Sequence, residues 1–374
     1  MSMSIVNQNS DFLFLFQATM TNPNGDPDQE NKPRMDYETM TLLVSDARRK
    51  RDCRDFLKEK KYHIFVDTLD DKKVPMDIMF ENIRDSWLNN KPKMERILAN
   101  GELKKKADDL FGTNVENYKN AYDLLIVDLK KKEGTDEEKK KRKSNTSKLK
   151  EFNNLFLTEI IKEDLIDIRL FGSAMAVEGI TKTFTGPIQI NWGYSLHPVE
   201  LVKSNTITTI MNDDSSTFGK QYKLHYGLIG HYGTVNKYSA IKTGMTEEDL
   251  KVFRKALVQG MMNNQTNSKQ GQTPLMYLEL IYKPDFDGYV GDLRRFLKCI
   301  YNNEKPIRKL DDIKIDFISL TQAISEMKKL GYLEKVIGWI HPFVFKNEVE
   351  RSNIFFELPE YESIDLWKPI EVVG

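Results

Sequence analysis

The sequence predicts an α+β protein whose βαββαβ core is interrupted once by a long helical insertion. Three observations lead to this fold class. Short apolar segments typical of strands occur before residue 20 and again after residue 187. Segments with helical periodicity and capping residues follow two of these strands. Between the two parts, residues 62–164 are polar and helix-like, so we expect them to form the insertion.

The first strand and the first helix enclose a loop rich in turn-forming residues. The continuous apolar run Phe12–Phe16 is typical of a short strand that is buried on both faces. Ser45 or Asp46 can cap a helix that continues to about Lys61. The apolar stripe of this helix faces the sheet and consists of Leu43, Ala47, Cys53, Phe56 and Leu57. Its solvent side carries Arg51, Arg54 and Lys58.

The remaining core elements follow the insertion. Ile188–Trp192 and Tyr222–Tyr226 alternate between apolar and polar residues, which predicts two strands. Thr246–Asp249 is a capping-box variant, with aspartate in place of glutamate, that opens an amphipathic helix. Leu275–Tyr282 is a further apolar strand. The resulting element order is the ferredoxin-like topology, which is also that of the RNA-recognition fold, and it hosts too many functions to decide this one.

Two segments depart from this core, which we expect to consist of residues 1–61 and 165–374. Within the insertion, residues 130–148 are rich in lysine and nearly free of apolar residues, which predicts a flexible loop or a frayed helix. A solvated linker is the simpler interpretation, and a diffuse counter-charge for DNA or RNA is the alternative. Residues 199–222 are β-prone and mostly uncharged, which predicts a protruding hairpin, with an ordinary surface loop as the alternative.

Composition limits the possible classes of protein. Hydrophobic residues at 40% and charged residues at 30% describe a soluble chain, and no apolar run reaches the roughly 18 residues of a membrane helix. Residues 1–10 lack the features of a signal peptide, so we expect a cytoplasmic protein without a membrane partner. Cys53 and Cys299 are the only cysteines, which argues against disulfides and zinc. A formal net charge of zero does not exclude RNA, because the local field of one basic groove decides binding.

The loop from Asn22 to Asp36 is the strongest candidate for a binding site. It joins a buried strand to a helix with a basic face, and it is too long for a tight hairpin. A strand, a loop rich in proline, glycine and asparagine, and a basic helix can together hold phosphates.

Catalytic and metal motifs are weak in the sequence. Alternating Asn and Asp residues in the loop suggest a calcium site, but the glycine and the distal glutamate are out of register. The five histidines show no metal spacing, and no phosphate-binding glycine loop or serine nucleophile motif occurs. We therefore expect no metal and no cofactor.

The loop and four further motifs resemble the backbone subunit of type I CRISPR surveillance complexes (Cascade), in particular the subtype I-B and I-C branches of the RAMP superfamily. The loop reads NPNGDPDQENKPRMD and is followed by LVSDARRKRDCRDFL. Matching segments occur in the same order at residues 167–175, 186–199 and 226–233. The resemblance covers most of the chain outside the insertion.

The resemblance implies a non-catalytic subunit of which several copies line up along one CRISPR guide RNA and present it to invading target DNA. It implies that residues 199–222 form a thumb that inserts between guide nucleotides, and that residues 171–179 form an RNA-contacting loop. Its implied partners are the guide RNA, target DNA, further copies of the chain, the large subunit, the subunit that caps the guide 5′ end, and the guide-processing endonuclease. The candidate RNA-binding residues are Asn24, Arg34, Lys50, Arg51, Arg54, Ser173, Met175, Met211 and Phe218.

Two alternatives remain open at this point. Related backbone subunits of type III complexes cleave RNA with an acidic residue in a comparable loop, so Asp26 or Asp36 could act on a bound target RNA. The other role of these carboxylates is turn and cap formation. A generic RNA-binding protein with one RNA site is the third possibility. For Asp167 and Arg169, a structural ion pair is as plausible as RNA binding.

Overall fold

The computed structural model describes residues 4–67, 74–113, 115–177, 180–208, 218–344 and 358–372. The chain divides into two compact units. Unit 1 comprises Met1–Lys61, Pro187–Tyr238 and Thr246–Gly374. Unit 2 comprises Tyr62–Gly186 and Ser239–Met245. Residues 165–186 therefore belong with the insertion, whereas the sequence pattern had placed them in the core.

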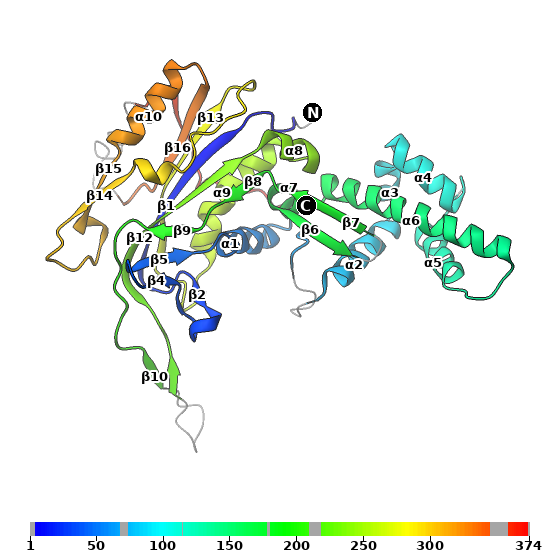
Figure 1. The fold of residues 1–374 in the computed structure, drawn as a ribbon, viewed down its shortest axis with the longest axis horizontal. Coiled ribbons are helices and arrows are strands. Elements are labelled where there is room, and N and C mark those ends of the chain that lie inside the picture. Colours follow the sequence, from blue (N-terminus) through cyan, green and yellow to red (C-terminus); the bar gives the residue numbers. More distant parts are fainter. Residues whose placement is uncertain are drawn as a thin grey trace. The chain divides into compact units, whose positions relative to one another are not determined.

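Unit 1 is built on one mixed sheet (Figure 1). Three long strands form its centre: β1 (Ser10–Thr21) pairs antiparallel with both β12 (Leu224–Val235) and β13 (Gln272–Tyr282). The described strands are ordered β17-β16-β13-β1-β12-β9-β5-β4, and β8 also pairs with β12. The outer strands are β4 (Met35–Asp36), β5 (Thr41–Val44), β8 (Ile188–Ile190), β9 (Gly193–Ser195), β16 (Leu333–Ile340) and β17 (Tyr361–Ser363). The predicted α+β class is confirmed.

Two helices of unit 1 pack against each other and carry the predicted caps. In α1 (Asp46–Glu59) the Ser45 side chain accepts a hydrogen bond from the Arg48 amide. In α9 (Glu247–Asn263) Thr246 and Asp249 form both hydrogen bonds of the capping box, as predicted. A Cβ atom added at Gly260 would lie 2.7 Å from the carbonyl oxygen of Asp52, so glycine permits the close approach of α9 to α1.

A buried charge pair connects α9 to the sheet. Glu279 on β13 is fully buried and accepts hydrogen bonds from Arg254 Nε at 2.7 Å and Arg254 Nη2 at 3.0 Å. Ser10 Oγ and Tyr277 Oη also donate to this carboxylate, at 2.6 and 2.7 Å. Four donors compensate the loss of hydration, so the pKa of Glu279 stays below its ordinary value although burial raises it.

The rest of unit 1 consists of short elements, some of which cover the sheet. Their bounds are β10 (Thr206–Thr208), β11 (Phe218–Lys220), α8 (Lys237–Thr243, which continues into unit 2), a 3-10 turn at Leu293–Phe296, β14 (Lys298–Tyr301), β15 (Ile313–Asp316) and α10 (Ile318–Lys329). Strands β10 and β11 pair antiparallel, and so do β14 and β15. The predicted hairpin at residues 199–222 thus has a two-stranded stem, and residues 209–217 lie outside the described ranges.

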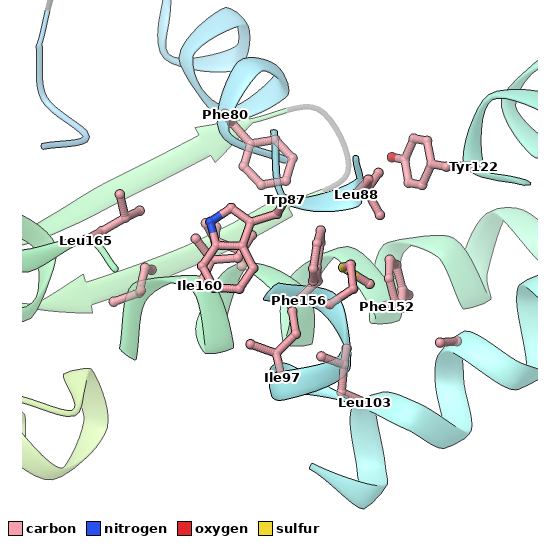
Figure 2. Packing of buried hydrophobic residues seen from close by; sticks show 14 of the residues in the cluster. Phe80, Trp87, Leu88, Ile97, Leu103, Tyr122, Phe152, Phe156, Ile160 and Leu165 are labelled. Carbon is pink, nitrogen blue, oxygen red and sulfur yellow. The ribbon is translucent and has the colours of Figure 1, made fainter. Parts of the chain in front are cut away.

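Unit 2 is mostly helical and has its own apolar core (Figure 2). Trp87, Phe152 and Phe156 are almost fully buried at its centre. The helices are α2 (Met76–Leu88), α3 (Lys91–Ile97), α4 (Gly101–Phe111), α5 (Tyr118–Leu129), α6 (Asp136–Glu163) and α7 (Ile166–Phe171), followed by the paired strands β6 (Gly172–Val177) and β7 (Ile180–Thr185).

Most of the lysine-rich segment is helical, which agrees with the second of its two predicted alternatives, a flexible loop or a frayed helix. Helix α6 begins at Asp136, where Thr135 and Glu138 form a complete capping box. Residues 136–148 include no buried residue, whereas residues 149–163 carry the apolar stripe of the unit 2 core. The segment is therefore the exposed beginning of a 28-residue helix that packing anchors further along.

A candidate nucleic-acid interface

The loop from Asn22 to Asp36 folds as a small hairpin with a tight turn at its tip. Strands β2 (Gly25–Asp26) and β3 (Lys32–Pro33) pair antiparallel, and a 3-10 turn spans Pro27–Gln29. The Asp26 side chain accepts a hydrogen bond from the Asp28 amide and lies 3.4 Å from the Arg34 guanidinium. The turn ends at Glu30 and Asn31, which both have left-handed backbone conformations. Asp26 thus has the structural role expected of turn residues.

Asp36 is likewise engaged in local structure. Its carboxylate accepts hydrogen bonds from the Thr39 hydroxyl at 2.8 Å and the Glu38 amide at 3.0 Å. The Thr39 bond, followed by the amide bond, lowers the pKa of Asp36 below its ordinary value. Among the described residues, no group of three or more His, Cys, Asp or Glu side chains could hold a metal ion.

Asn24 joins the loop to the beginning of α1. It is 8% exposed, and its side-chain oxygen accepts hydrogen bonds from the Ser45 amide at 2.9 Å and the Ser45 hydroxyl at 2.8 Å. The Asn24 carbonyl accepts a further bond from the Arg34 amide at 2.9 Å. Since this oxygen is committed to Ser45, Asn24 positions the loop relative to the helix.

The predicted cations lie on α1 and in the loop of unit 1, and three of them lie beside a carboxylate or an aromatic ring. Lys50 pairs with Asp46 at 2.9 Å, and Arg51 pairs with Asp55 at the surface. Arg54 is on the same helix and partly exposed. Arg34 lies 5.7 Å from the centre of the Trp192 ring. Surface ion pairs of this kind contribute little to stability, so a phosphate can replace the carboxylate at low cost.

The sequence did not identify Arg49, which is the most deeply buried cation of the region at 1% exposed. Its guanidinium stacks on the Phe16 ring at 5.0 Å, lies 3.0 Å from the Asp52 carboxylate and donates to Gln272 at 3.2 Å. Burial lowers its pKa, although an arginine stays charged. Helical periodicity could have revealed it, because residue 49 is four positions before Cys53 on the buried stripe.

Hydrogen-bonding groups without a partner accumulate in this region. Among the described side chains, nine buried nitrogen or oxygen atoms have no hydrogen-bond partner, and six of them lie near the loop and α1. These six are Asn22 Oδ1, Arg34 Nε, Arg48 Nε, Arg49 Nε, Arg49 Nη1 and His231 Nε2. Four are guanidinium donors. Buried donors are nearly always paired, so this concentration is unusual. Arg34 and Arg48 are partly exposed and can donate to an acceptor at the surface, whereas Arg49 is too buried to do so.

Positive charge also exceeds negative charge beside α1. Arg48 and Arg49 share the single carboxylate of Asp52, which also accepts from Asn264 at 2.7 Å. Lys269 lies close enough for both arginines to lower its pKa. Burial, followed by the Arg49 charge, lowers the pKa of His231 to about 3, so this imidazole is neutral. The excess charge favours an anionic ligand.

The stem of the β10–β11 hairpin contacts the same loop. Tyr222 Oη donates to Glu30 at 2.7 Å, and Lys220 Nζ lies 3.4 Å from the same carboxylate. Lys32 lies 5.3 Å from the centre of the Tyr222 ring. The loop and the hairpin stem therefore lie beside each other in unit 1.

The other predicted site residues are less completely described. Phe218 opens β11, and its backbone pairs with Thr208. Met211 lies outside the described residues. Ser173 and Met175 are in unit 2, where both belong to β6 instead of the predicted loop. Gly172 has φ +69°, and a Cβ there would lie 2.1 Å from the Phe184 carbonyl oxygen, so glycine permits the sharp turn from α7 into β6.

Asp167 and Arg169 make local structural contacts. Asp167 accepts hydrogen bonds from the amides of Phe65 and Val66, at 2.9 and 3.1 Å. Arg169 donates to the carbonyl of Ile161 at 3.1 Å. Both side chains thus connect the segments that open and close the insertion.

Comparisons with known proteins agree with the motif resemblance. A family model described as CRISPR-associated protein Cas7 matches residues 8–318. A CRISPR-associated protein Cas7 from Haloferax volcanii is 22% identical over 341 residues, which cover 85% of this chain and 83% of that protein. A chain of a CRISPR RNA-guided surveillance complex in a pre-nicking state superimposes with a TM-score of 0.50 at 12% identity, covering 96% of this chain and 97% of that chain. Another such complex gives a TM-score of 0.43 at 10% identity, covering 96% and 97%. Within the described ranges, no helix is long and apolar enough to cross a membrane.

Proposed function

This chain belongs to the Cas7 family of CRISPR-associated proteins, and we propose that it is a non-catalytic backbone subunit of a type I surveillance complex. Several copies line up along one CRISPR guide RNA, hold its sugar–phosphate backbone and present its bases to target DNA. Because guides differ in sequence, binding relies on phosphate contacts and shape instead of base edges.

The cluster of unused guanidinium donors at the loop and α1 carries this proposal. Four of the six unpartnered atoms there belong to Arg34, Arg48 and Arg49. Arg34 belongs to the loop and Arg48 and Arg49 to the helix that follows it, and the loop carboxylates of Asp26 and Asp36 are used in turns. A phosphate offers several strong acceptor oxygens and neutralises the excess charge, so it suits this surface better than a neutral ligand does.

The proposed roles follow from exposure. Arg34, Lys50, Arg51 and Arg54 contact phosphates, and Arg48, whose side chain is 22% exposed, joins them. Arg49 is too buried for direct contact in this arrangement, and it contributes charge. Asn24 positions the loop. Ser173, Met175, Met211 and Phe218 remain proposed contacts to the RNA backbone, base or sugar.

The architecture supports the same assignment. Strands β13, β1, β12 and β9 are adjacent in the sheet in that order, and each pairs antiparallel with its neighbour. Along the chain, α1 comes between β1 and β9, and α9 comes between β12 and β13. We infer a ferredoxin-like palm in unit 1, a helical insertion in unit 2 and a thumb at the β10–β11 hairpin. The proposed partners in the cytoplasm are the guide RNA, target DNA, further copies, the large subunit, the 5′-end cap subunit and the guide-processing endonuclease.

Cleavage of target RNA by Asp26 or Asp36 is the less favoured function. Asp26 caps a turn and pairs with Arg34, and Asp36 accepts two local hydrogen bonds. A ribonuclease of this kind predicts metal-dependent cleavage of a complementary RNA that Asp26→Ala or Asp36→Ala abolishes.

Co-expression with a CRISPR repeat–spacer array and the other subunits tests the proposal. We expect the wild type to retain guide RNA from unrelated spacers through a high-salt wash. Arg51→Glu with Arg54→Glu should lose most of this RNA, because each change replaces a phosphate contact by a repulsive charge. The matched control, Lys298→Glu with Lys314→Glu on the hairpin β14–β15, makes the same change of charge elsewhere in unit 1. Equal RNA retention by the two double variants would contradict the proposed site.

A further inference from the structure

Lys269 holds the beginning of the loop by two hydrogen bonds. It lies in the connection between α9 and β13, and its ammonium donates to the carbonyls of Asn22 at 2.6 Å and Pro23 at 3.1 Å. The Asn22 amide and the Thr21 hydroxyl both donate back to the Ser268 carbonyl, at 3.0 and 2.7 Å. The first turn of the loop is therefore bonded in both directions to this connection.

The ammonium of Lys269 lies in an environment that disfavours its positive charge. It is partly buried, and the charged groups that face it are Arg48, Arg49 and Asp52 on α1. The loop residues that it contacts contribute only carbonyls. Burial and the two arginines together lower the pKa of Lys269 to about 8, and Asp52 opposes this only in part.

A phosphate beside α1 would change this balance. An anion within a few ångströms of Lys269 favours its charged form, as Asp52 already does. A charged ammonium also makes stronger hydrogen bonds to the two loop carbonyls than a neutral amine does. The loop conformation and the anion therefore both depend on the proton of Lys269.

We propose that Lys269 is a positioning residue that holds the loop for RNA phosphates, and that RNA binding by this chain therefore takes up a proton at Lys269 in mildly alkaline solution. This inference rests on the proposed function. The direct consequence is that RNA affinity falls as the pH rises through 8, by at most tenfold for each pH unit, since one proton is involved. Between pH 7 and pH 9 the expected loss is about tenfold.

Loss of folding stability on deprotonation of Lys269 does not explain this fall in RNA affinity. The pKa of this lysine is lower in the folded chain than the ordinary value of 10.5. The unfolded chain therefore binds more protons between pH 8 and pH 10, and deprotonation of this group stabilises the folded chain as the pH rises. A fall in RNA affinity without a fall in melting temperature distinguishes the positioning role from loss of structure.

The experiment compares the wild type with Lys269→Arg and Lys269→Met in the full chain. Fluorescence anisotropy with a labelled single-stranded RNA of mixed sequence gives the affinity at pH 7.0, 8.0 and 9.0, and thermal unfolding follows folding at each pH. We expect the wild type to lose about tenfold between pH 7 and 9. Lys269→Arg keeps its charge and should stay nearly constant, whereas Lys269→Met should bind weakly at every pH. Titration of the RNA bases affects the affinity of all three proteins equally, so the role of Lys269 is judged from the differences between their pH profiles.

Calorimetry on the wild type gives a second readout that needs no variant. At pH 8.0, RNA binding in buffers of different ionisation enthalpy should show uptake of about half a proton per copy. Zero uptake, or identical pH profiles for the wild type and Lys269→Arg, would overturn the inference and leave the proposed function intact. No RNA binding by the wild type at pH 7.0 would contradict the proposed function itself, and this inference with it.

Discussion

Removing the guanidinium groups of Arg51 and Arg54 should weaken the salt dependence of RNA binding while leaving the fold intact. The Arg51 side chain is 41% exposed and its partner Asp55 is 48% exposed, so this pair contributes at most about 1 kcal/mol to stability. Arg51→Gln with Arg54→Gln should therefore unfold at nearly the wild-type temperature. The effect on RNA should be larger, because we propose that each residue neutralises one phosphate.

The magnitude follows from counterion release. Each neutralised phosphate of a single strand contributes roughly 0.7 to the slope of log affinity against log salt concentration, so two lost contacts lower the slope by roughly 1.4. Between about 50 and 200 mM salt, the wild type should lose roughly sevenfold more affinity than the variant.

The assay is fluorescence anisotropy at four potassium chloride concentrations. The RNA is a labelled strand short enough to hold one copy, which removes effects of cooperativity. Lys298→Gln with Lys314→Gln on the hairpin β14–β15 is the control, and its slope should equal that of the wild type. If the Arg51/Arg54 variant has the wild-type slope, phosphates do not bind to this face of α1.

Three further predictions concern the fold. Arg254→Met leaves the buried carboxylate of Glu279 without its counter-charge, so the free energy of unfolding should fall by about 3–5 kcal/mol. A urea titration measures this fall, and a loss below about 1 kcal/mol would contradict the role of this pair. Thr135→Ala removes the cap of α6 and should speed hydrogen exchange in its first turns about fivefold without lowering the melting temperature of unit 2, and unchanged exchange would show that the cap contributes nothing. The hydrogen bond with Asp164 raises the pKa of His63. The stability that this bond gives the folded chain is therefore complete below the ordinary histidine pKa of 6.5 and is lost as the pH rises through the pKa of the folded chain. Urea unfolding at pH 5.5 and 8.5 should show this loss in the wild type, and an equal loss in His63→Gln would refute the role of His63.

Local signals predicted the framework of unit 1 well. The run Phe12–Phe16 lies within β1, the Ser45 cap opens α1, and the Thr246 capping box opens α9. These elements depend on residues close together in the sequence, where apolar patterning and capping act directly. The family assignment from the ordered motifs is confirmed by the match over residues 8–318.

The errors and the open alternatives have physical causes that a local pattern does not contain. The lysine-rich segment has no apolar stripe, so the sequence left a flexible loop and a frayed helix as alternatives; a cap and the buried residues further along α6 stabilise the helix. Ser173 and Met175 were placed in a core loop, whereas pairing with β7 makes a strand in unit 2. Strand pairing joins residues through the fold, so a single segment does not predict it.

Arg49 and Lys269 show the same limit for the site. Each looks like a surface cation in the sequence, and each acquires its role from distant residues. Arg49 is buried against Phe16 and Gln272, and Lys269 bonds to carbonyls almost 250 positions earlier in the chain. Basic residues could be counted from the sequence, but their burial depends on tertiary packing.

The number of copies bound to RNAs of increasing length tests the central claim most directly. Native mass spectrometry of the purified full chain with single strands of several lengths and two unrelated sequences gives this number. The account predicts that copies are added stepwise as the RNA lengthens, equally for both sequences, because phosphates and shape are recognised. One bound copy at every length, or binding to only one of the two sequences, would contradict a subunit that lines up along the guide.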